Sequence, residues 1–280
     1  MTNCLSVPID DLLKNGFKVR QTDIRPAGSL NTALQLVAVL FQIQSLQQFG
    51  GVAATHIDHS MVPYVRKSFR KHYLHHWIMS LEEFDELDIL GISHTELQHW
   101  VENKLTEFFL KNDFKDEDFK FNNEILKSTV ELNKLHQKAL FSTKKECYQG
   151  VEALYHNLNS LQSRSGNQLP FSSVNYGTCT LPEGRMITKA LLECSIKGLG
   201  KMGRTSIFPC GIFQVMSGVN KEPGTPNYDL KRLALKSTAE RIYPNYVNVD
   251  WSVNAGYDIN DPRTYMSTMG KCKCSSCKTL

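Results

Sequence analysis

The alternation of strand-like and helix-like segments in the last third of the chain constrains the fold most strongly. Residues 169–184 have the pattern of a strand followed by a turn, and residues 185–200 have helical spacing with glycine at the end. Residues 205–216 include a short apolar run suited to a buried strand, and residues 230–244 form a predicted helix stopped by proline. Strands that alternate with helices are typical of α/β proteins, so we expect a parallel sheet or barrel.

A further strand is predicted directly after the last of these helices. Val247, Val249, Trp251 and Val253 alternate with polar residues, which is the period of a strand with one buried face. A loop is the open alternative, because Asn, Asp and Ser residues interrupt the apolar series.

A long apolar helix is predicted near the N-terminus, within residues 26–51. Ser29 is a suitable N-cap, and Gly50 and Gly51 end the segment. Apolar residues recur between them at helical spacing: Leu30, Ala33, Leu34, Val37, Leu40 and Phe41. Because this apolar stripe is wide and carries no charge, we expect the helix to be buried on most sides.

The region from about residue 63 to residue 162 differs from the rest of the chain in its dense charge. Glycine and proline become rare there, and stretches such as residues 122–141 have the pattern of amphipathic helices. We therefore expect a helical layer with a solvated outer face, of the kind that often carries a subunit contact.

The composition narrows the class of protein. Of 280 residues, 41% are hydrophobic and 21% are charged, which is typical of a soluble globular protein. The formal net charge of +4 is spread along the chain, so the charge pattern of a dedicated nucleic-acid-binding protein is missing. No apolar run approaches the ~20 residues of a membrane helix, and the N-terminus lacks a signal-peptide pattern. We expect a cytoplasmic protein that binds neither membrane nor nucleic acid.

The eight cysteines fall into two groups. Five stand singly and are expected to be reduced, buried apolar side chains: Cys4, Cys147, Cys179, Cys194 and Cys210. The other three, Cys272, Cys274 and Cys277, have C-x-C-x-x-C spacing near the end of the sequence. A structural zinc ion takes four ligands, commonly as two separated pairs, and this cluster offers three. We expect no metal site, and a zinc-dependent binding module is the alternative interpretation.

Two polar clusters allow more than one interpretation. His72 and His76 share a helix face at i and i+4, but no acidic residue completes a familiar metal signature, so solvated or stacking histidines are favoured. Ser172, Ser173 and Asn175 lie within a β-like stretch. Such a strand either lines a polar pocket or forms a sheet edge, and composition leaves both open.

Three further stretches are long enough to identify a family. They read "HNLNSLQSRSGNQLPFSSVNYGT", "GRTSIFPCGIFQVMSGVNKEPGTPNYDLKRLALKSTAERIYPNY" and "YMSTMG". These stretches closely resemble the large subunit of the anaerobic (class III, glycyl-radical) ribonucleoside-triphosphate reductases, and residues 23–69 look like the first barrel helix and strand of that family. The resemblance runs from about Asn3 to Gly270.

The resemblance implies a fold and a chemistry. The family fold is a ten-stranded α/β barrel built from two five-stranded parallel halves, and residues 1–270 are expected to form the first half together with the helical layer. A finger loop through the barrel carries a cysteine that a glycyl radical converts to a thiyl radical. The thiyl abstracts the 3′-hydrogen of the ribonucleotide and the 2′-hydroxyl leaves as water. Formate or a thiol supplies the electrons.

The resemblance also implies residue roles. Cys272 is the candidate thiyl residue, although Lys271 stands at the position where the family has its cysteine. The polar set Ser172, Ser173 and Asn175 becomes the candidate contact to the ribonucleoside triphosphate substrate.

The helical layer acquires an expected role as well. By resemblance it forms a homodimer contact beside a site for deoxynucleoside triphosphate effectors. Lys144, Lys145 and Gln149 are the candidate effector contacts, because cationic and amide donors suit a triphosphate.

Departures from the family limit these expectations. Residues 271–280 are expected to be a non-homologous tail after a break in the finger loop. The chain is then inactive without a missing C-terminal half, or else a nonfunctional truncated product. No cofactor is expected in this chain. The complete enzyme would need a glycyl radical made by a radical-SAM activating enzyme, and Val52 and Ala53 stand where many formate-using members carry a cysteine, which leaves the reductant open.

Overall fold

The computed structural model divides the chain into two compact units. One comprises Met1–Val62 with Cys147–Leu280 and is called the sheet unit; the other, Pro63–Glu146, is called the helical unit. The structure describes residues 4–47, 50–82, 95–96, 99, 103, 121, 130–161, 168–251, 258–265 and 268. The predicted helical layer, residues 63–162, overlaps the helical unit, and its limits stay a prediction.

A five-stranded parallel sheet forms the centre of the sheet unit. Its order is β1-β4-β5-β6-β7, and each neighbouring pair is parallel. The expected α/β fold with a parallel sheet is therefore confirmed. The strands are β1 (Leu5–Ser6), β4 (Val52–Ala54), β5 (Ser172–Tyr176), β6 (Cys210–Val215) and β7 (Asn245–Asn248).

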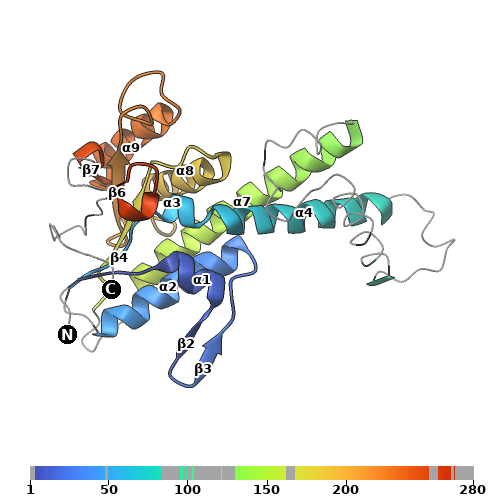
Figure 1. Ribbon diagram of the computed structural model, residues 1–280, viewed down its shortest axis with the longest axis horizontal. Helices are drawn as coiled ribbons and strands as arrows, with labels where there is room; N and C mark the ends of the chain where they lie inside the picture. Colours follow the sequence, from blue (N-terminus) through green and yellow to red (C-terminus); the bar gives the residue numbers. More distant parts are fainter. Residues whose placement is uncertain are drawn as a thin grey trace. The chain divides into compact units, whose positions relative to one another are not determined.

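The strand order determines where the crossover helices lie. The strands follow one another in space as they do in the chain, so right-handed crossovers all fall on the same face of the sheet. The helices concerned are α2 (Leu30–Gln47), α8 (Pro182–Lys197) and α9 (Tyr228–Arg241), seen around the strands in Figure 1. A hydrogen bond of 2.9 Å between the hydroxyls of Thr238 on α9 and Tyr246 marks this helix-covered face on β7. One covered face and one face without crossover helices is the layout of a barrel wall.

Helix α2 has the boundaries and burial that its sequence predicts. The backbone N–H of Thr32 donates to Ser29 Oγ at 3.3 Å, which confirms Ser29 as the N-cap. All six apolar positions of the predicted stripe are buried, at most 4% exposed. The C-terminal half of α7 (Val130–Ser160) packs on it, because a Cβ at Gly150 would stand 2.8 Å from Leu34 Cδ1.

The strand predicted after α9 is confirmed only in its first half. Val247 and Val249 are buried, but β7 ends at Asn248 and Trp251 lies in a helical turn, 54% exposed. The strand prediction is therefore wrong at Trp251, and Val253 lies outside the described residues. Shorter elements complete the unit: α1 (Ile9–Asn15), the antiparallel pair β2 (Phe17–Val19) and β3 (Thr22–Ile24), α3 (Ile57–Ser60) and a 3₁₀ turn η3 (Pro262–Thr264).

Two histidines of α4 (Val62–Glu82) are hydrogen-bonded to α7 within the helical unit. His72 Nε2 lies 2.8 Å from Glu146 Oε2, and His76 Nε2 lies 2.8 Å from Ser142 Oγ. Burial lowers the pKa of His76, and the neighbouring charges of His75, His72 and Lys138 act in the same direction. Within the described ranges, no group of three or more His, Cys, Asp or Glu residues is placed to hold a metal ion.

The five described cysteines form no disulfide bond with one another, and the expected burial holds for two of them. Cys147 and Cys179 are buried, while Cys4, Cys194 and Cys210 are partly exposed. The C-terminal cluster at 272, 274 and 277 lies outside the described residues. None of the helices that the structure describes is both long and apolar enough to span a membrane.

The N-terminus of α8 packs so closely that one glycine is required there. A Cβ at Gly184 would overlap Cys179 Sγ, lie 2.6 Å from Cys179 Cβ and lie 3.0 Å from the carbonyl of Asp58. We predict that Gly184→Ala lowers the free energy of unfolding by about 1–3 kcal/mol through overpacking. The matched control is Gly28→Ala, because nothing lies within 4 Å of a Cβ at exposed Gly28. Urea unfolding measures both, and equal small losses in the two variants would contradict this packing.

Candidate active site

The carboxyl ends of the parallel strands gather polar loops at one edge of the sheet. Residues 55–56 follow β4, residues 177–179 follow β5, and residues 216–220 follow β6. In parallel α/β sheets this edge is where ligands bind, because loops there are free of the packing that holds the strands. The edge is therefore the first place to look for a site, and we call it the carboxyl edge.

Asp58 holds the loop after β5. Its Oδ2 accepts hydrogen bonds from the backbone N–H groups of Gly177 at 2.9 Å and Cys179 at 3.0 Å, and its Oδ1 accepts from the N–H of His59 at 3.1 Å. The side chain is fully buried, so these three donors replace the water that a carboxylate requires. The turn itself needs glycine, because Gly177 has a φ of 121°.

Two asparagines hold the carbonyls of the same loop. Asn227 Nδ2 donates to the carbonyls of Gly177 at 3.1 Å and Cys179 at 2.9 Å. Asn220 Nδ2 donates to Gly177 at 2.9 Å and to the carbonyl of Gln214 at 2.8 Å. Both side chains are fully buried, so the loops after β5 and β6 are fixed to each other.

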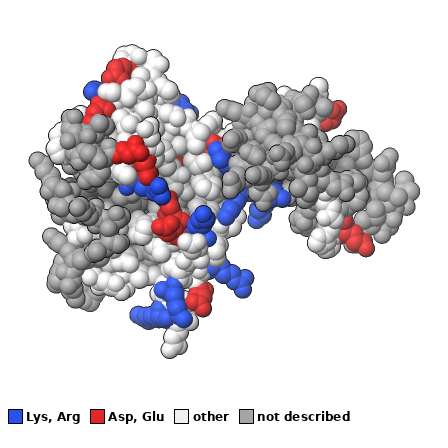
Figure 2. Space-filling view, in the orientation of Figure 1, with Lys and Arg blue, Asp and Glu red and all other residues white. Residues whose placement is uncertain are grey.

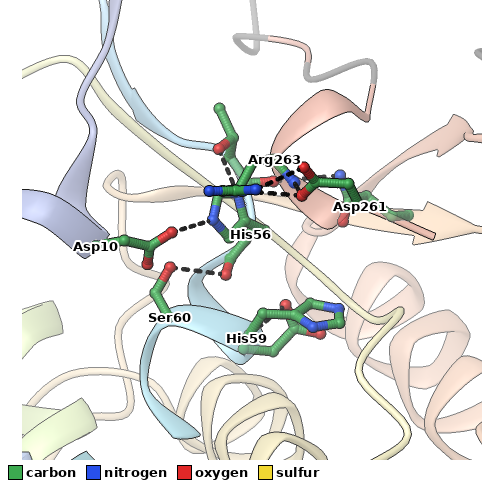
Figure 3. A network of polar contacts seen from close by, with 9 residues as sticks. Asp10, His56, His59, Ser60, Asp261 and Arg263 are labelled. Carbon is green, nitrogen blue, oxygen red and sulfur yellow. Dashed lines mark hydrogen bonds and ion pairs between the residues drawn. The ribbon is translucent and has the colours of Figure 1, made fainter. Parts of the chain in front are cut away.

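A hydrogen-bonded chain of three side chains stands beside these loops. Thr55 Oγ1 lies 2.6 Å from His56 Nδ1, and His56 Nε2 lies 2.6 Å from Asp10 Oδ2. Figure 3 shows the Asp10 carboxylate pointing at the imidazole, with Ser60 below it donating to the carbonyl of His56 at 3.1 Å. The histidine is 7% exposed, so the ring is held between its two partners.

The charge on Asp10 determines which atoms of these three hydrogen-bonded side chains donate and which accept. Burial alone would raise the pKa of Asp10, but the hydrogen bond and charge of His56 outweigh it, and Ser60 and Arg263 add to them, so the pKa lies below 3.8. Asp10 is then an acceptor for His56 Nε2–H, and in the neutral imidazole Nδ1 accepts from the Thr55 hydroxyl. Such an arrangement can pass a proton between Thr55 and His56.

Charged residues occur at the edge as pairs and are missing from the sheet. None of the strand residues of β1, β4, β5, β6 and β7 is Asp, Glu, Lys, Arg or His. At the edge, Arg263 pairs with Asp261 at 2.8 Å, beside His56 and Asp10 in Figure 3, and Lys221 pairs with Asp250 at 3.0 Å. Acidic and basic side chains are likewise interspersed on the surface seen in Figure 2. The site therefore combines a neutral sheet with two ion pairs at its edge and the buried carboxylate of Asp58, which accepts from backbone N–H groups.

The strand pleat separates the three residues predicted to bind substrate. Successive side chains of β5 point to opposite faces, so Ser173 and Asn175 share one face and Ser172 lies on the other. Tyr176, on the face of Ser172, contacts Phe213, which lies beside Tyr246 on the helix-covered side. Ser173 and Asn175 therefore lie on the face without crossover helices. The role of all three residues in substrate binding stays a prediction.

A fourth polar residue, Gln214, joins this face. In the β5–β6 register Asn175 is level with Ile212, so Ile212 and Gln214 share the face of Ser173 and Asn175, which we call the amide face. Asn175 Nδ2 donates to the carbonyl of Ala54 at 3.0 Å, and Gln214 Nε2 donates to that of Thr55 at 3.2 Å. In the sequence, Gln214 stands in an apolar run. The only feature that could have identified it as a site residue is that it is a single amide in such a run.

The remaining predicted site residues are dispersed. Lys144, Lys145 and Gln149 are exposed on α7, the first two in the helical unit and Gln149 in the sheet unit. Phe141, at i−3 and i−4 from the two lysines, is 71% exposed and lies on the same side of the helix. Cys272, the predicted thiyl residue, lies outside the described residues.

Comparison with known proteins identifies relatives for nearly the whole chain. A family model described as anaerobic ribonucleoside-triphosphate reductase matches residues 1–277. The anaerobic ribonucleoside-triphosphate reductase of Haemophilus influenzae is 28% identical over 270 residues, 96% of this chain and 31% of that protein. The Escherichia coli protein of the same name is 27% identical, with the same coverage. The chain thus spans about a third of the length of these curated relatives.

Solved structures of similar description were also found. One is the anaerobic ribonucleotide reductase from Thermotoga maritima in complex with dATP and CTP, with 13% identity and a TM-score of 0.48. A second, of the same protein with citrate in the active site, has 14% identity and a TM-score of 0.49. They cover 89% of this chain and 34% and 36% of their own chains.

The ion pair of Asp10 and His56 makes a prediction about pH. Because the pKa of Asp10 is lowered on folding, its contribution to the free energy of unfolding is full above pH ~4 and is lost as pH falls through the folded pKa. We predict that stability falls less steeply below that pH in Asp10→Asn than in the unmodified chain. His56→Leu, which removes the donor, should flatten the profile in the same way. Urea titrations between acidic and neutral pH measure the slopes, and an unchanged slope in Asp10→Asn would contradict the assignment.

Proposed function

The chain belongs to the anaerobic ribonucleoside-triphosphate reductase family, and we propose that it supplies the first half of the catalytic barrel of such an enzyme. The observation that carries this proposal is the five-stranded parallel sheet in chain order, for which right-handed crossovers all fall on one face. The other face, with Ser173, Asn175 and Gln214, is then the inner face of the barrel.

The proposed reaction is the reduction of ribonucleoside triphosphates to deoxyribonucleoside triphosphates. The matched relatives are about three times as long as the aligned stretch, so these 280 residues account for part of that reaction. In the family the rest of the subunit supplies a glycyl radical, generated by a radical-SAM activating enzyme, and formate or a thiol is the reductant. The role of this chain is to bind the nucleotide and to hold its ribose at the inner face.

The segment that would carry the thiyl residue begins against this face. Asn175 Nδ2 lies 3.4 Å from the carbonyl of Thr268, two residues before Gly270. This contact supports the interpretation of residues 265–270 as the start of a finger loop. Cys272 is the proposed thiyl residue. A zinc-binding function would rest on Cys272, Cys274 and Cys277 alone, and we do not propose it.

We also propose that the face of α7 with Phe141, Lys144 and Lys145 contributes to effector binding and to a homodimer contact. An exposed aromatic ring beside two lysines offers a surface for a base or a partner helix next to cations for a triphosphate. Gln149 lies in the sheet unit, and its part in effector binding stays a prediction.

The central proposal predicts activity only on reconstitution. We expect no turnover from this chain alone, and deoxyribonucleotide formation when it is mixed without oxygen with the C-terminal part of the Escherichia coli relative, an activating enzyme, formate and CTP. Because Lys271 stands where the family has its cysteine, Cys272 comes one residue later in the sequence. One residue of extended chain spans ~3.3 Å. A 1 Å misplacement can cost about 100-fold in rate, so deletion of Lys271 should raise activity.

The matched controls for the reconstitution are two serine variants. Cys272→Ser should abolish turnover, whereas Cys274→Ser should leave it unchanged. Turnover by the unmodified chain alone, or a fully active Cys272→Ser enzyme, would show that the assignment is wrong.

The effector proposal is tested by equilibrium dialysis with labelled deoxynucleoside triphosphates. Loss of charge-assisted hydrogen bonds in Lys144→Ala with Lys145→Ala should weaken binding by about tenfold or more. Lys134→Ala removes another exposed lysine of α7 and should leave binding unchanged. Equal affinities in the two variants would exclude the proposed surface.

A further inference from the structure

A short hairpin near the N-terminus carries basic side chains that the proposed function does not use. Strands β2 and β3 form a two-stranded sheet of their own, and Figure 1 shows it extending away from α1 and α2. Residues 14–25 contain four basic side chains and one acidic one, whereas the whole chain contains 32 and 28. Basic groups gather over this hairpin in Figure 2. We call residues 14–25 the basic arm, and its cations are Lys14, Lys18, Arg20 and Arg25.

The cations of the basic arm are little compensated by neighbouring acidic groups. All four are exposed. Lys18 Nζ lies 4.0 Å from Asp23 Oδ1, and both side chains are largely exposed, so water screens this pair. Within the described residues, Lys14, Arg20 and Arg25 form no ion pair. The basic arm therefore presents a local positive surface that attracts anionic groups.

Arg20 stands at the turn of the hairpin in a conformation that suits glycine better than arginine. Val19 pairs with Thr22, so Arg20 and Gln21 are the two residues of the turn. The φ of Arg20 is 55°, in the left-handed region where tight hairpin turns usually carry glycine or asparagine. Glycine would form this turn with less strain. The local fold therefore does not call for arginine here, and the use of this residue lies in its exposed guanidinium.

The base of the basic arm is held by backbone contacts. The N–H of Ala27 donates to the carbonyl of Leu13 at 3.0 Å, and a Cβ at Gly16 would overlap the carbonyl of Ile24. Phe17 and Ile24, directly opposite each other in the hairpin, are half-buried. The arm is thus already ordered, which lowers the conformational entropy that a partner must overcome on binding.

Two observations favour a peptide over a nucleic acid as the partner of the basic arm. In the described part of the chain, each strand of this sheet has a neighbouring strand on one side only. The outer edges therefore offer backbone N–H and C=O groups that an added peptide strand can pair with. A nucleic acid would contact the four cations through phosphates, and proteins that bind DNA mainly by charge make about 6–10 such contacts.

We propose that the basic arm is a docking site for an extended acidic segment of a partner protein. The segment adds a strand to β3, which is the more exposed of the two strands, and its carboxylates pair with Arg20 and Arg25 on either side of β3. Backbone hydrogen bonds supply affinity of little sequence preference, and the arginines select acidic side chains. The inference does not rest on the proposed function, because it uses no residue of the carboxyl edge or the amide face.

The experiment measures binding of a fluorescein-labelled octapeptide of alternating glutamate and valine to the full chain by fluorescence anisotropy. Alternation places the carboxylates on one side of an added strand. The unmodified chain should bind this peptide at low salt, and about 0.5 M salt should weaken binding because exposed charges are screened. Arg20→Gly combined with Arg25→Ala should weaken binding by about tenfold or more.

The matched control removes two exposed charges from the loop between α8 and β6. Lys201→Ala combined with Arg204→Ala should bind the octapeptide as the unmodified chain does. Thermal unfolding separates loss of binding from loss of fold, and Arg20→Gly alone should weaken binding in a chain that is at least as stable, because glycine relieves the strained turn. An octapeptide of alternating lysine and valine should not bind.

The outcomes that overturn the proposal are distinct from one another. Failure of the unmodified chain to bind the acidic octapeptide at low salt overturns it without any variant. Unchanged binding by folded Arg20→Gly overturns it as well, as does equal weakening in the control variant. Tighter binding of single-stranded oligothymidylate through the same two arginines would make the arm a nucleic-acid site and reject the acidic segment. Each of these results leaves the proposed function standing.

Discussion

The loop after β5 depends on side chains that replace its missing backbone partners, and the carboxyl edge depends on that loop. Residues 177–179 leave the sheet and so lose the ladder that pairs strand N–H and C=O groups. Asp58 supplies the acceptor for two N–H groups, and Asn220 and Asn227 supply donors for the carbonyls. Without these three buried side chains the loop would carry several unpaired groups away from water, each at a cost of about 1–3 kcal/mol.

The same three residues connect elements that are distant in the chain. Asp58 lies on α3 after β4, Asn220 in the turn after β6, and Asn227 immediately before α9. Because all three meet at one loop, the ends of β4, β5 and β6 are held in one arrangement. The positions of His56, next to Asp58, and of Gln214, whose carbonyl accepts from Asn220, follow from it. A rigid scaffold of this kind is what a site needs to keep its groups in place.

Local sequence pattern predicted the elements, and tertiary contacts determined the site. The helix α2 could be predicted because its buried residues repeat at a fixed period, and β6 because it lies in a short apolar run. The Asp10–His56 pair could not, because its members are 46 residues apart and each alone looks like a solvated polar residue. The strand prediction was wrong at Trp251, because the alternation of apolar and polar residues continues past Asn248, where β7 ends. Period alone does not distinguish a buried strand from an extended loop.

Strand β5 shows why polar residues that are close in sequence do not by themselves define a site. Ser172, Ser173 and Asn175 were grouped because they are polar and close in sequence, yet residues at consecutive positions of a strand cannot share a face. Pairing register then places Gln214 on the same face as Asn175, and no single-strand pattern contains that information. Valine or isoleucine at both amide positions would suit the interior of a parallel sheet better. The two carboxamides instead donate to the carbonyls of Ala54 and Thr55, so they hold the end of β4 against β5 and β6 by hydrogen bonds that apolar side chains could not make.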